Sequence, residues 1–281
     1  MMKRLFPIIW GLLSAFLFMA LHGGTPPISG LVEMPNGVAN VMSTITPAAG
    51  NGDYVGSPKV TTWATKSRLS PPGTASIDRF EVRDGDQALI DVGTDKNRSE
   101  MADVHTKWAV GTTIWVAYSM YVVRADQQNG SIIGQLHGTG ITGPGSAATV
   151  PFYASVYHNN ILYSVQGSTE NPVVDVPAVT NIQVVPLVTN TWINFVHKIK
   201  FGPSGDGTLD SWVNGAHLVS YTGVIGFSMD NGTYWKYGWY GSTDGNPSAV
   251  AIVWYANMEV GTADLSDRIL NPKPVPVGTL W

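Results

Sequence analysis

The stretch Leu209-Asp-Ser-Trp-Val213, followed by the pair Asn214-Gly215 and then by Ala216-His-Leu-Val-Ser-Tyr221, decides the fold. Asn-Gly between two strand-like segments is a strong signal for a two-residue β-hairpin, because both turn positions need a positive φ. The sequence therefore predicts an antiparallel strand pair over 209–213 and 216–221.

Side chains alternate with period two in several other segments, as expected of half-buried strands. We expect strands over 113–123, 152–157, 161–166, 192–201 and 249–260. The second and third of these form a hairpin across His158-Asn159-Asn160. In the last strand, Val250, Ile252, Trp254, Ala256 and Met258 are expected on one side. No amphipathic stretch of 12 residues predicts a long helix.

The composition agrees with a β-rich protein. The 281 residues include 31 Gly and 18 Pro, with 44% hydrophobic and 13% charged residues, which favours one large core and short strands joined by tight turns. About a dozen short strands in one unit are typical of a jelly roll. The predicted fold class is all-β: a concanavalin-like β-jelly-roll sandwich of two antiparallel sheets, one of which forms a cleft suited to an extended polymer.

The N-terminal segment has the layout of a secretory signal peptide. Lys3 and Arg4 precede an apolar run from Leu5 to Leu21. That run is short for a spanning helix of about 20 residues, so we favour cleavage over an uncleaved anchor, which would be the chain's one membrane contact. We expect a signal peptide or anchor over 1–24, an irregular lead-in packed on the sandwich over 25–72 and the jelly roll over 73–281. The folded part is expected to be secreted, to the periplasm or the extracellular space.

Charge and cysteine content exclude several classes of protein. The chain has no Cys, so its core alone must hold it together. Loss of residues 1–24 lowers the 16 Lys and Arg to 14, against 20 Asp and Glu, which gives a net charge of −6. An acidic net charge of this kind does not predict binding to nucleic acid. The sequence also lacks a phosphate-binding glycine loop, so it does not predict nucleotide binding.

Hydrolytic chemistry finds little support in the sequence. There is no Gly-x-Ser-x-Gly elbow and no paired-His zinc motif. A glycoside hydrolase needs two carboxylates, and the candidates are Glu81 and Asp84. Because Glu81 and Arg83 share a strand face and Asp84-Gly85 is typical of a turn, we interpret this run as a strand end.

Three short segments carry the chemical signal: Arg98-Ser99-Glu100, Gln135-Leu136-His137 and Tyr234-Trp-Lys-Tyr-Gly-Trp-Tyr240. Each alone is typical of a structural strand. In this order they resemble the jelly-roll alginate lyases, which carry Arg-Ser/Thr-Glu, Gln-Ile/Val-His and Tyr-Phe-Lys-Ala-Gly-x-Tyr on strands lining one groove. The chain is more similar still to the heparin-lyase and glucuronan-lyase-like branch, through Arg79–Asp86 and the hairpin Gly207–Gly215.

The resemblance implies an exported polysaccharide lyase that cleaves a uronic-acid polymer by β-elimination and leaves unsaturated uronate ends. It implies four catalytic residues and four substrate-binding residues: Arg98, Gln135, His137 and Tyr240 as catalytic, and Arg83, Glu100, Tyr234 and Lys236 as substrate-binding. Arg98 and Gln135 suit the substrate carboxylate, since a guanidinium fork and an amide donor match its oxygens. His137 and Tyr240 are the proton-transfer candidates, and which of them is the base stays open. Tyr234 shares a strand face with Tyr240, which is preferred because the family's acid follows the motif Lys by four residues.

Departures from the alginate-lyase pattern bear on the substrate. Met101-Ala102 follows Glu100 where a second Arg is usual, Tyr237 replaces an Ala, and Gly241-Ser242 replaces Asn-Gln. A densely sulfated heparin would want more cations than the chain offers. We therefore expect a glucuronan-like polymer, with alginate and heparin-type polymers as alternatives.

Neither a cofactor nor a metal site follows from the residues. Some relatives carry a structural calcium ion, so calcium stays open, although no EF-hand-type loop places one. A carbohydrate-binding, lectin-like sandwich without catalysis is the alternative function. His197 is expected to be a buried structural residue, and the sequon Asn97-Arg98-Ser99 to be accidental.

Overall fold

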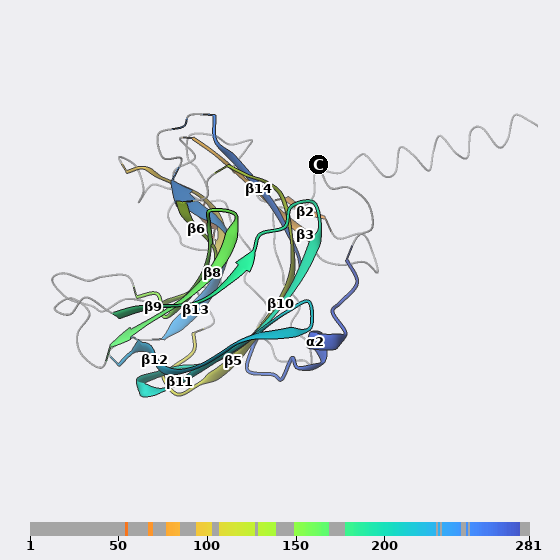
Figure 1. Ribbon diagram of the computed structural model, residues 1–281. Helices are drawn as coiled ribbons and strands as arrows, with labels where there is room; N and C mark the ends of the chain where they lie inside the picture. Colours follow the sequence, from red (N-terminus) through yellow and green to blue (C-terminus); the bar gives the residue numbers. More distant parts are fainter. Residues whose placement is uncertain are drawn as a thin grey trace, which may run out of the picture.

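The computed structural model describes residues 54–55, 67–69, 77–84, 94–102, 107–126, 129–138, 149–168, 178–228, 230, 232–242, 246 and 248–275. Its strands form two layers, which we call sheet A and sheet B (Figure 1). Sheet A runs in the order β1 (Tyr54–Val55), β4 (Lys96–Ala102), β13 (Thr233–Ser242), β6 (Asn129–Gly138), β7 (Phe152–Tyr157), β8 (Asn160–Ser168) and β9 (Ala178–Pro186). Sheet B runs in the order β2 (Ser67–Leu69), β3 (Ile77–Arg83), β14 (Val250–Gly261), β5 (Thr113–Ala125), β10 (Trp192–Lys200), β11 (Gly202–Val213) and β12 (Ala216–Phe227).

The two sheets join at one edge. There β12 pairs with β8 through Gly226 and Gly167, in the one parallel pairing among the described strands. The backbones approach so closely that a Cβ on Gly167 would lie 2.4 Å from the carbonyl oxygen of Gly226. Every other pairing between these strands is antiparallel, so the expected all-β jelly-roll sandwich is confirmed.

The hairpin that decides the fold is confirmed. Asn214 and Gly215 have φ of 49° and 83° and connect β11 to β12. The second hairpin differs from the prediction, because its loop has two residues, not three. His158 and Asn159 both adopt positive φ, and Asn160 pairs with Tyr157 as the first residue of β8. Asn tolerates the left-handed region, which permits the tighter turn.

The last strand also differs from simple alternation. Asn257, with φ of 56°, lies where the register of β14 against β5 shifts. A bulge of this kind adds a residue to one strand and reverses the faces beyond it. Met258 is therefore buried in the core, whereas Trp254 and Ala256 lie on the opposite face of β14 in a separate apolar cluster. The prediction that Met258 shares a side with Trp254 was wrong for this reason.

The core fills the space between the sheets with large aromatic side chains. Trp235, Tyr237 and Trp239 from β13 are fully buried there. Tyr255 of β14 ties the two sheets together, since its hydroxyl donates to the carbonyl oxygens of Ile133 (2.6 Å) and Gly238 (3.0 Å) in sheet A. The middle of sheet A, which carries the candidate site, is thus anchored on sheet B.

The C-terminal segment after β14 holds the short helix α2 (Asp267–Leu270), which lies beside β10 (Figure 1). Its anchor is Glu259, a buried carboxylate that pairs with Arg268 (2.9 Å) and Lys273 (2.5 Å). No described helix is long and apolar enough to cross a membrane.

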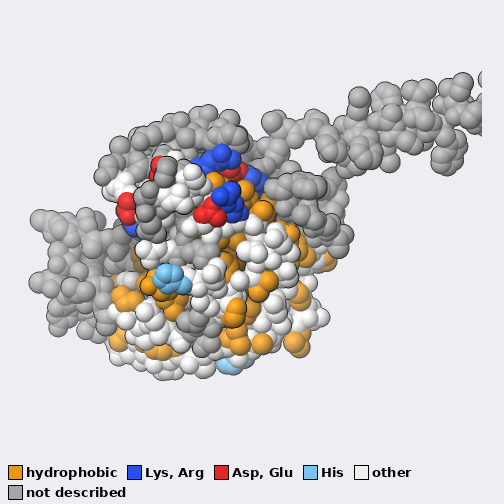
Figure 2. Space-filling model, turned by 45° about the horizontal axis from the view of Figure 1, so that its top comes forward, with side chains coloured by type: hydrophobic (Ala, Val, Ile, Leu, Met, Phe, Trp, Pro, Cys, Tyr) orange, Lys and Arg blue, Asp and Glu red, His pale blue; other side chains and the backbone are white. Residues whose placement is uncertain are grey.

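The face drawn in Figure 2 carries few charged side chains among the described residues. In Figure 2, acidic and basic side chains gather in one part of the visible face, and most of the other described side chains there are uncharged.

The predicted segment 1–24 lies outside the described residues. Of the predicted lead-in 25–72 only β1 and β2 are described, and they pair with β4 and β3 respectively.

Candidate active site

Three neighbouring strands of sheet A bring the predicted residues together. In their register Arg98 of β4 lies opposite Tyr240 of β13, while Lys236 and Tyr234 of β13 lie opposite Gln135 and His137 of β6. The intervening residues of β13 point into the core, so these side chains share the face turned away from sheet B, which we call the outer face of sheet A. Seven of the eight predicted site residues lie on it: Arg98, Glu100, Gln135, His137, Tyr234, Lys236 and Tyr240.

Glu100 is the centre of this arrangement. Its carboxylate accepts hydrogen bonds from Gln135 Nε2 (2.8 Å) and Arg98 Nη1 (3.3 Å) and lies 2.7 Å from Lys236 Nζ. Glu100 is 1% exposed. Burial alone would raise the pKa of Glu100, but the charges of Lys236 and Arg98 outweigh it and hold the pKa below its usual value. Glu100 is therefore an ionised group that orients its three neighbours, and little of it is left for direct contact with a substrate.

His137 is a neutral imidazole with a fixed tautomer. Its Nδ1 lies 2.8 Å from the carbonyl oxygen of Gly138. Because a carbonyl oxygen only accepts, Nδ1 carries the proton and Nε2 keeps its lone pair. Burial, followed by the positive charge of Lys236, lowers the pKa of His137 to about 4. His137 can therefore accept a proton at Nε2 at any pH well above 4.

Arg98 and Tyr240 are in direct contact. The guanidinium carbon of Arg98 lies 3.9 Å from the centre of the Tyr240 ring, a cation–π arrangement. Arg98 is 11% exposed, held between this ring and Glu100. The contact places the permanent cation and the phenol hydroxyl group in one small region of the outer face.

Tyr234 differs from Tyr240 in its surroundings. Its ring packs at 5.3 Å from the His137 ring, and burial raises the pKa of Tyr234 to about 12. A phenol with so high a pKa is poorly suited to lose a proton near neutrality. Tyr234 therefore fits a positioning role beside His137 better than a role in proton transfer.

Gly238 allows β13 to lie against β4 at this point. Its φ is +133°, and a Cβ would lie 2.3 Å from the carbonyl oxygen of Ser99 and 2.8 Å from Cα of Glu100. Only glycine fits such an approach without displacing the strand that carries Arg98 and Glu100.

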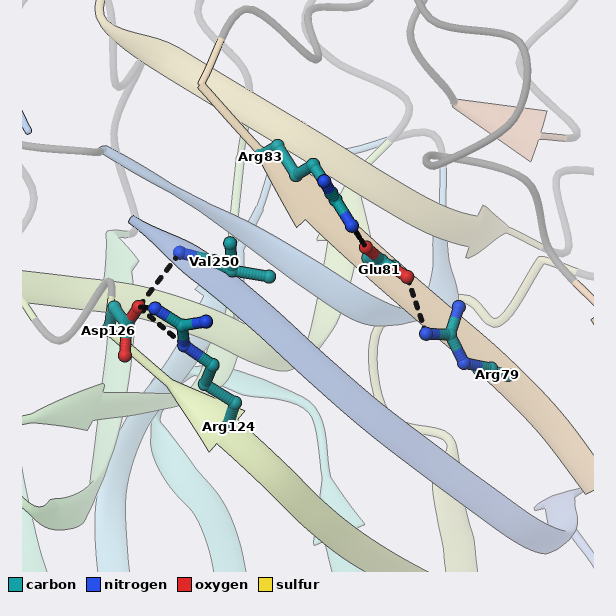
Figure 3. Close-up of polar contacts among 6 residues, drawn as sticks. All are labelled: Arg79, Glu81, Arg83, Arg124, Asp126 and Val250. Carbon is teal, nitrogen blue, oxygen red and sulfur yellow. Dashed lines mark hydrogen bonds and ion pairs between the residues drawn. The ribbon is translucent and has the colours of Figure 1, made fainter. Parts of the chain in front are cut away.

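The structure does not bring Arg83 to this face. Arg83 lies on β3 in sheet B, and its neighbours Phe80 and Val82 point into the core, so Arg83 points away from sheet A. It donates to Glu81 (2.7 Å), which also pairs with Arg79, as Figure 3 shows along β3. The substrate-binding role predicted for Arg83 has no support from this position.

The remaining sequence interpretations can be placed as well. His197 is fully buried, with Nδ1 2.8 Å from Ser211 Oγ, as expected for a structural histidine. Asn97 is 2% exposed on β4, so its sequon is not presented to solvent. Within the described part of the chain, no group of three His, Asp or Glu side chains is arranged to hold a metal ion. No motif predicted the role of the Gly138 carbonyl oxygen, which sets the tautomer of His137, because a backbone group is common to every residue.

The structure thus combines a two-layer β jelly roll with Arg, Gln, His and Tyr on the outer face of one sheet. The chain belongs to the polysaccharide lyase family, whose model matches residues 51–259. No curated protein matches the sequence.

Solved structures of lyases share the fold. The endo-β-1,4-glucuronan lyase from the fungus Trichoderma reesei is 16% identical, with a TM-score of 0.59 over 75% of this chain and 94% of that chain. A family 7 alginate lyase, crystallised as a variant with its substrate, is 13% identical, with a TM-score of 0.50 over 74% of this chain and 84% of that chain. These likenesses show the fold, and the family match over residues 51–259 shows the enzyme class, a polysaccharide lyase, as the motifs predicted.

Proposed function

We propose that this lyase cleaves a glucuronate-bearing polysaccharide by β-elimination at the outer face of sheet A. Removing the C5 proton of a uronate places a second negative charge beside its carboxylate, so the site must first neutralise that group. The observation that carries the proposal is the neutral His137, with a lone pair on Nε2, on the same outer face of sheet A as Arg98 and Tyr240. A carbohydrate-binding face needs no such base beside a cation and a phenol.

Two side chains serve the carboxylate and the enolate that develops from it. Arg98 supplies a permanent cation, and Gln135 supplies an amide whose Nε2 donates one N–H to Glu100. We propose that the second N–H of that amide donates to the substrate carboxylate. Donors held in place before the reaction stabilise developing charge strongly, and losing one costs on the order of 3 kcal/mol of barrier.

Proton transfer is assigned to His137 and Tyr240. His137 takes the C5 proton at Nε2, and Tyr240 gives its hydroxyl proton to the leaving glycosidic oxygen. Where the C5 proton and the C4 oxygen lie on the same side of the ring, as in glucuronate, Tyr240 alone can serve both steps, and a helping role of His137 at the carboxylate would require its protonated form. The two routes differ in whether the rate depends on the protonation of His137.

The substrate we favour is glucuronan or a similar polymer, with alginate as the runner-up and heparin-type polymers third. The likeness to a glucuronan lyase supports the first choice, and the departures from the alginate-lyase motif after Glu100 and Tyr240 weigh against the second. The low number of Lys and Arg weighs against a densely sulfated polymer.

Export of the enzyme is part of the same proposal. It rests on the signal-peptide layout of residues 1–24 and on the expectation that the polysaccharide substrate lies outside the cytoplasm. We propose that the reaction needs no cofactor, because the residues named above supply each proton and charge that the elimination requires.

The test is ultraviolet absorbance of glucuronan, alginate, heparin and pectin incubated with residues 25–281. Elimination leaves a conjugated C4–C5 double bond, which hydrolysis does not form. A rise on glucuronan, absent in the Tyr240→Phe variant, is the expected result. Flat traces with new reducing ends would mean hydrolysis, and flat traces with retained binding would mean a lectin; either would overturn the proposal.

A further inference from the structure

We propose that the half of sheet A formed by β7, β8 and β9 binds sugar residues without charge. Among glucuronate-bearing polymers, the preferred substrate would then be one in which the cleaved uronate is flanked on one side by neutral sugars, and glucuronan, which contains uronates alone, would be cleaved more slowly per uronate. This inference rests on the proposed uronate lyase function and narrows its substrate class.

The outer face of sheet A continues beyond the candidate site. In the strand register Gln135 of β6 lies opposite Tyr153 of β7, which lies opposite Ser164 of β8, which lies opposite Asn181 of β9. Ser164 Oγ donates to Asn181 Oδ1 at 2.7 Å, so these side chains point to the same side. A polymer that extends across the strands from the site in this direction meets β7, β8 and β9 in turn.

This continuation is uncharged in the part of the sheet that the structure describes. Because side chains alternate between the two faces of a strand, β7, β8 and β9 each present every second residue on the outer face, and the residues named next are all neutral. They are Tyr153, Ser155, Leu162, Ser164, Gln166, Val179 and Asn181. By contrast, β4 and β13 carry Lys96, Arg98 and Lys236.

The sequence reinforces the contrast. Between Arg124 and Lys198 the chain has no Lys or Arg, and its charged residues there are Asp126, Glu170 and Asp175. That interval contains β6 to β9 and all the connections between them. A carboxylate bound over β7, β8 or β9 would find no permanent cation in any of these strands or connections.

The same side chains suit neutral sugars. Tyr153 and Leu162 are partly exposed, and Val179 is 49% exposed, so they offer apolar surface to the C–H faces of sugar rings. Asn181 and Gln166 have amide groups that can both donate and accept hydrogen bonds with hydroxyls. Removing a carboxylate from water against such a surface, without a cation, is unfavourable.

The test uses glucuronan whose carboxylates are partly reduced, so that a known fraction of glucuronate residues becomes glucose within the same chain. The rate of double-bond formation is measured per remaining uronate, and the fragments are sequenced by mass spectrometry. We expect the rate per uronate to rise with reduction, and glucose to be enriched on one side of the cleaved bond. A rate per uronate that is highest on the unreduced polymer, or fragments with glucose at random, would overturn this inference while leaving the lyase function intact. No double bond on any of these polymers would instead overturn the proposed function, and the inference with it.

A matched pair of variants tests the half of sheet A formed by β7, β8 and β9 directly. Leu162→Lys places a cation on β8, which β7 separates from the catalytic strand β6, and Leu162→Gln changes polarity without charge. We expect Leu162→Lys to raise the rate on unreduced relative to reduced glucuronan by about two- to five-fold at low salt, the size of one exposed ion pair. The gain should disappear in high salt, where exposed charges are screened. Equal ratios in Leu162→Lys, Leu162→Gln and the parent enzyme would contradict the proposal.

Discussion

Lys236 Nζ lies 2.7 Å from Glu100 Oε2, and the side chains are 5% and 1% exposed. Two charges so buried stabilise each other only as a pair, because each would be costly alone. We predict that Glu100→Gln lowers the free energy of unfolding by about 3–5 kcal/mol. The double variant Glu100→Gln/Lys236→Met should recover most of this loss. Urea unfolding of both single variants and the double variant checks the prediction; additive losses would contradict it.

Replacing Tyr240 by Phe removes a hydroxyl proton without changing the ring that packs on Arg98. We expect Tyr240→Phe to fold normally and to lose roughly 10² to 10⁴ in kcat, the usual contribution of a general acid or base. Tyr234→Phe is the control, and its loss should be much smaller. A folded Tyr240→Phe protein with near-normal turnover would remove Tyr240 from the mechanism.

The pH dependence of kcat/KM reports on His137. A histidine base works only when deprotonated, so activity is lost as the pH falls through its pKa. Because burial and the charge of Lys236 lower this pKa to about 4, we expect the acid limb near pH 4, well below the 6.5 of a free imidazole. Lys236→Met removes the positive charge beside His137, so the pKa of His137 should rise and the acid limb should move to higher pH. A profile without an acid limb would mean that His137 is not the base.

Stability should also depend on pH through His197. This buried residue has a pKa of about 3 in the folded protein, lowered by burial, against about 6.5 when unfolded. Between these values the unfolded chain binds a proton that the folded chain does not, so stability falls as the pH falls from 6.5 towards 3. The slope contributed is up to about 1.4 kcal/mol per pH unit. Chemical unfolding at several pH values should show a shallower slope in His197→Gln; an unchanged slope would contradict this assignment.

Gly238→Ala tests the contact between β13 and β4. The new Cβ would meet the Ser99 carbonyl oxygen at 2.3 Å with φ at +133°, so we expect a loss of at least about 2 kcal/mol of stability. Gly130→Ala is the matched control, because Gly130 also has positive φ but open space around its Cβ. It should cost only about 1 kcal/mol. Equal losses in the two variants would mean that strain alone, without a steric clash, determines the effect.

Much of the fold follows from local patterns in the sequence. Alternation in Thr113–Val123 predicts the core face of β5, and Asn214-Gly215 predicts the turn between β11 and β12. Both are local properties of a few neighbouring residues. The prediction fails where a bulge adds a residue and reverses the alternation of faces, as at Asn257 in β14. A bulge depends on the pairing with the neighbouring strand, which a local pattern does not contain.

The sequence by itself determined that the chain is a β sandwich, and its motifs pointed to Arg98, Gln135, His137 and Tyr240, because strand periodicity and motif order are written along the chain. Only the tertiary structure decided how these groups act together. Pairing of β4, β13 and β6 surrounds Glu100 with Arg98, Gln135 and Lys236. The same packing lowers the pKa of His137, so that its side chain is neutral. Arg83 lies on β3 in the other sheet and is not part of this group. Hydrogen-bond partners, burial and electrostatic fields arise between strands far apart in the sequence, and no single segment contains them.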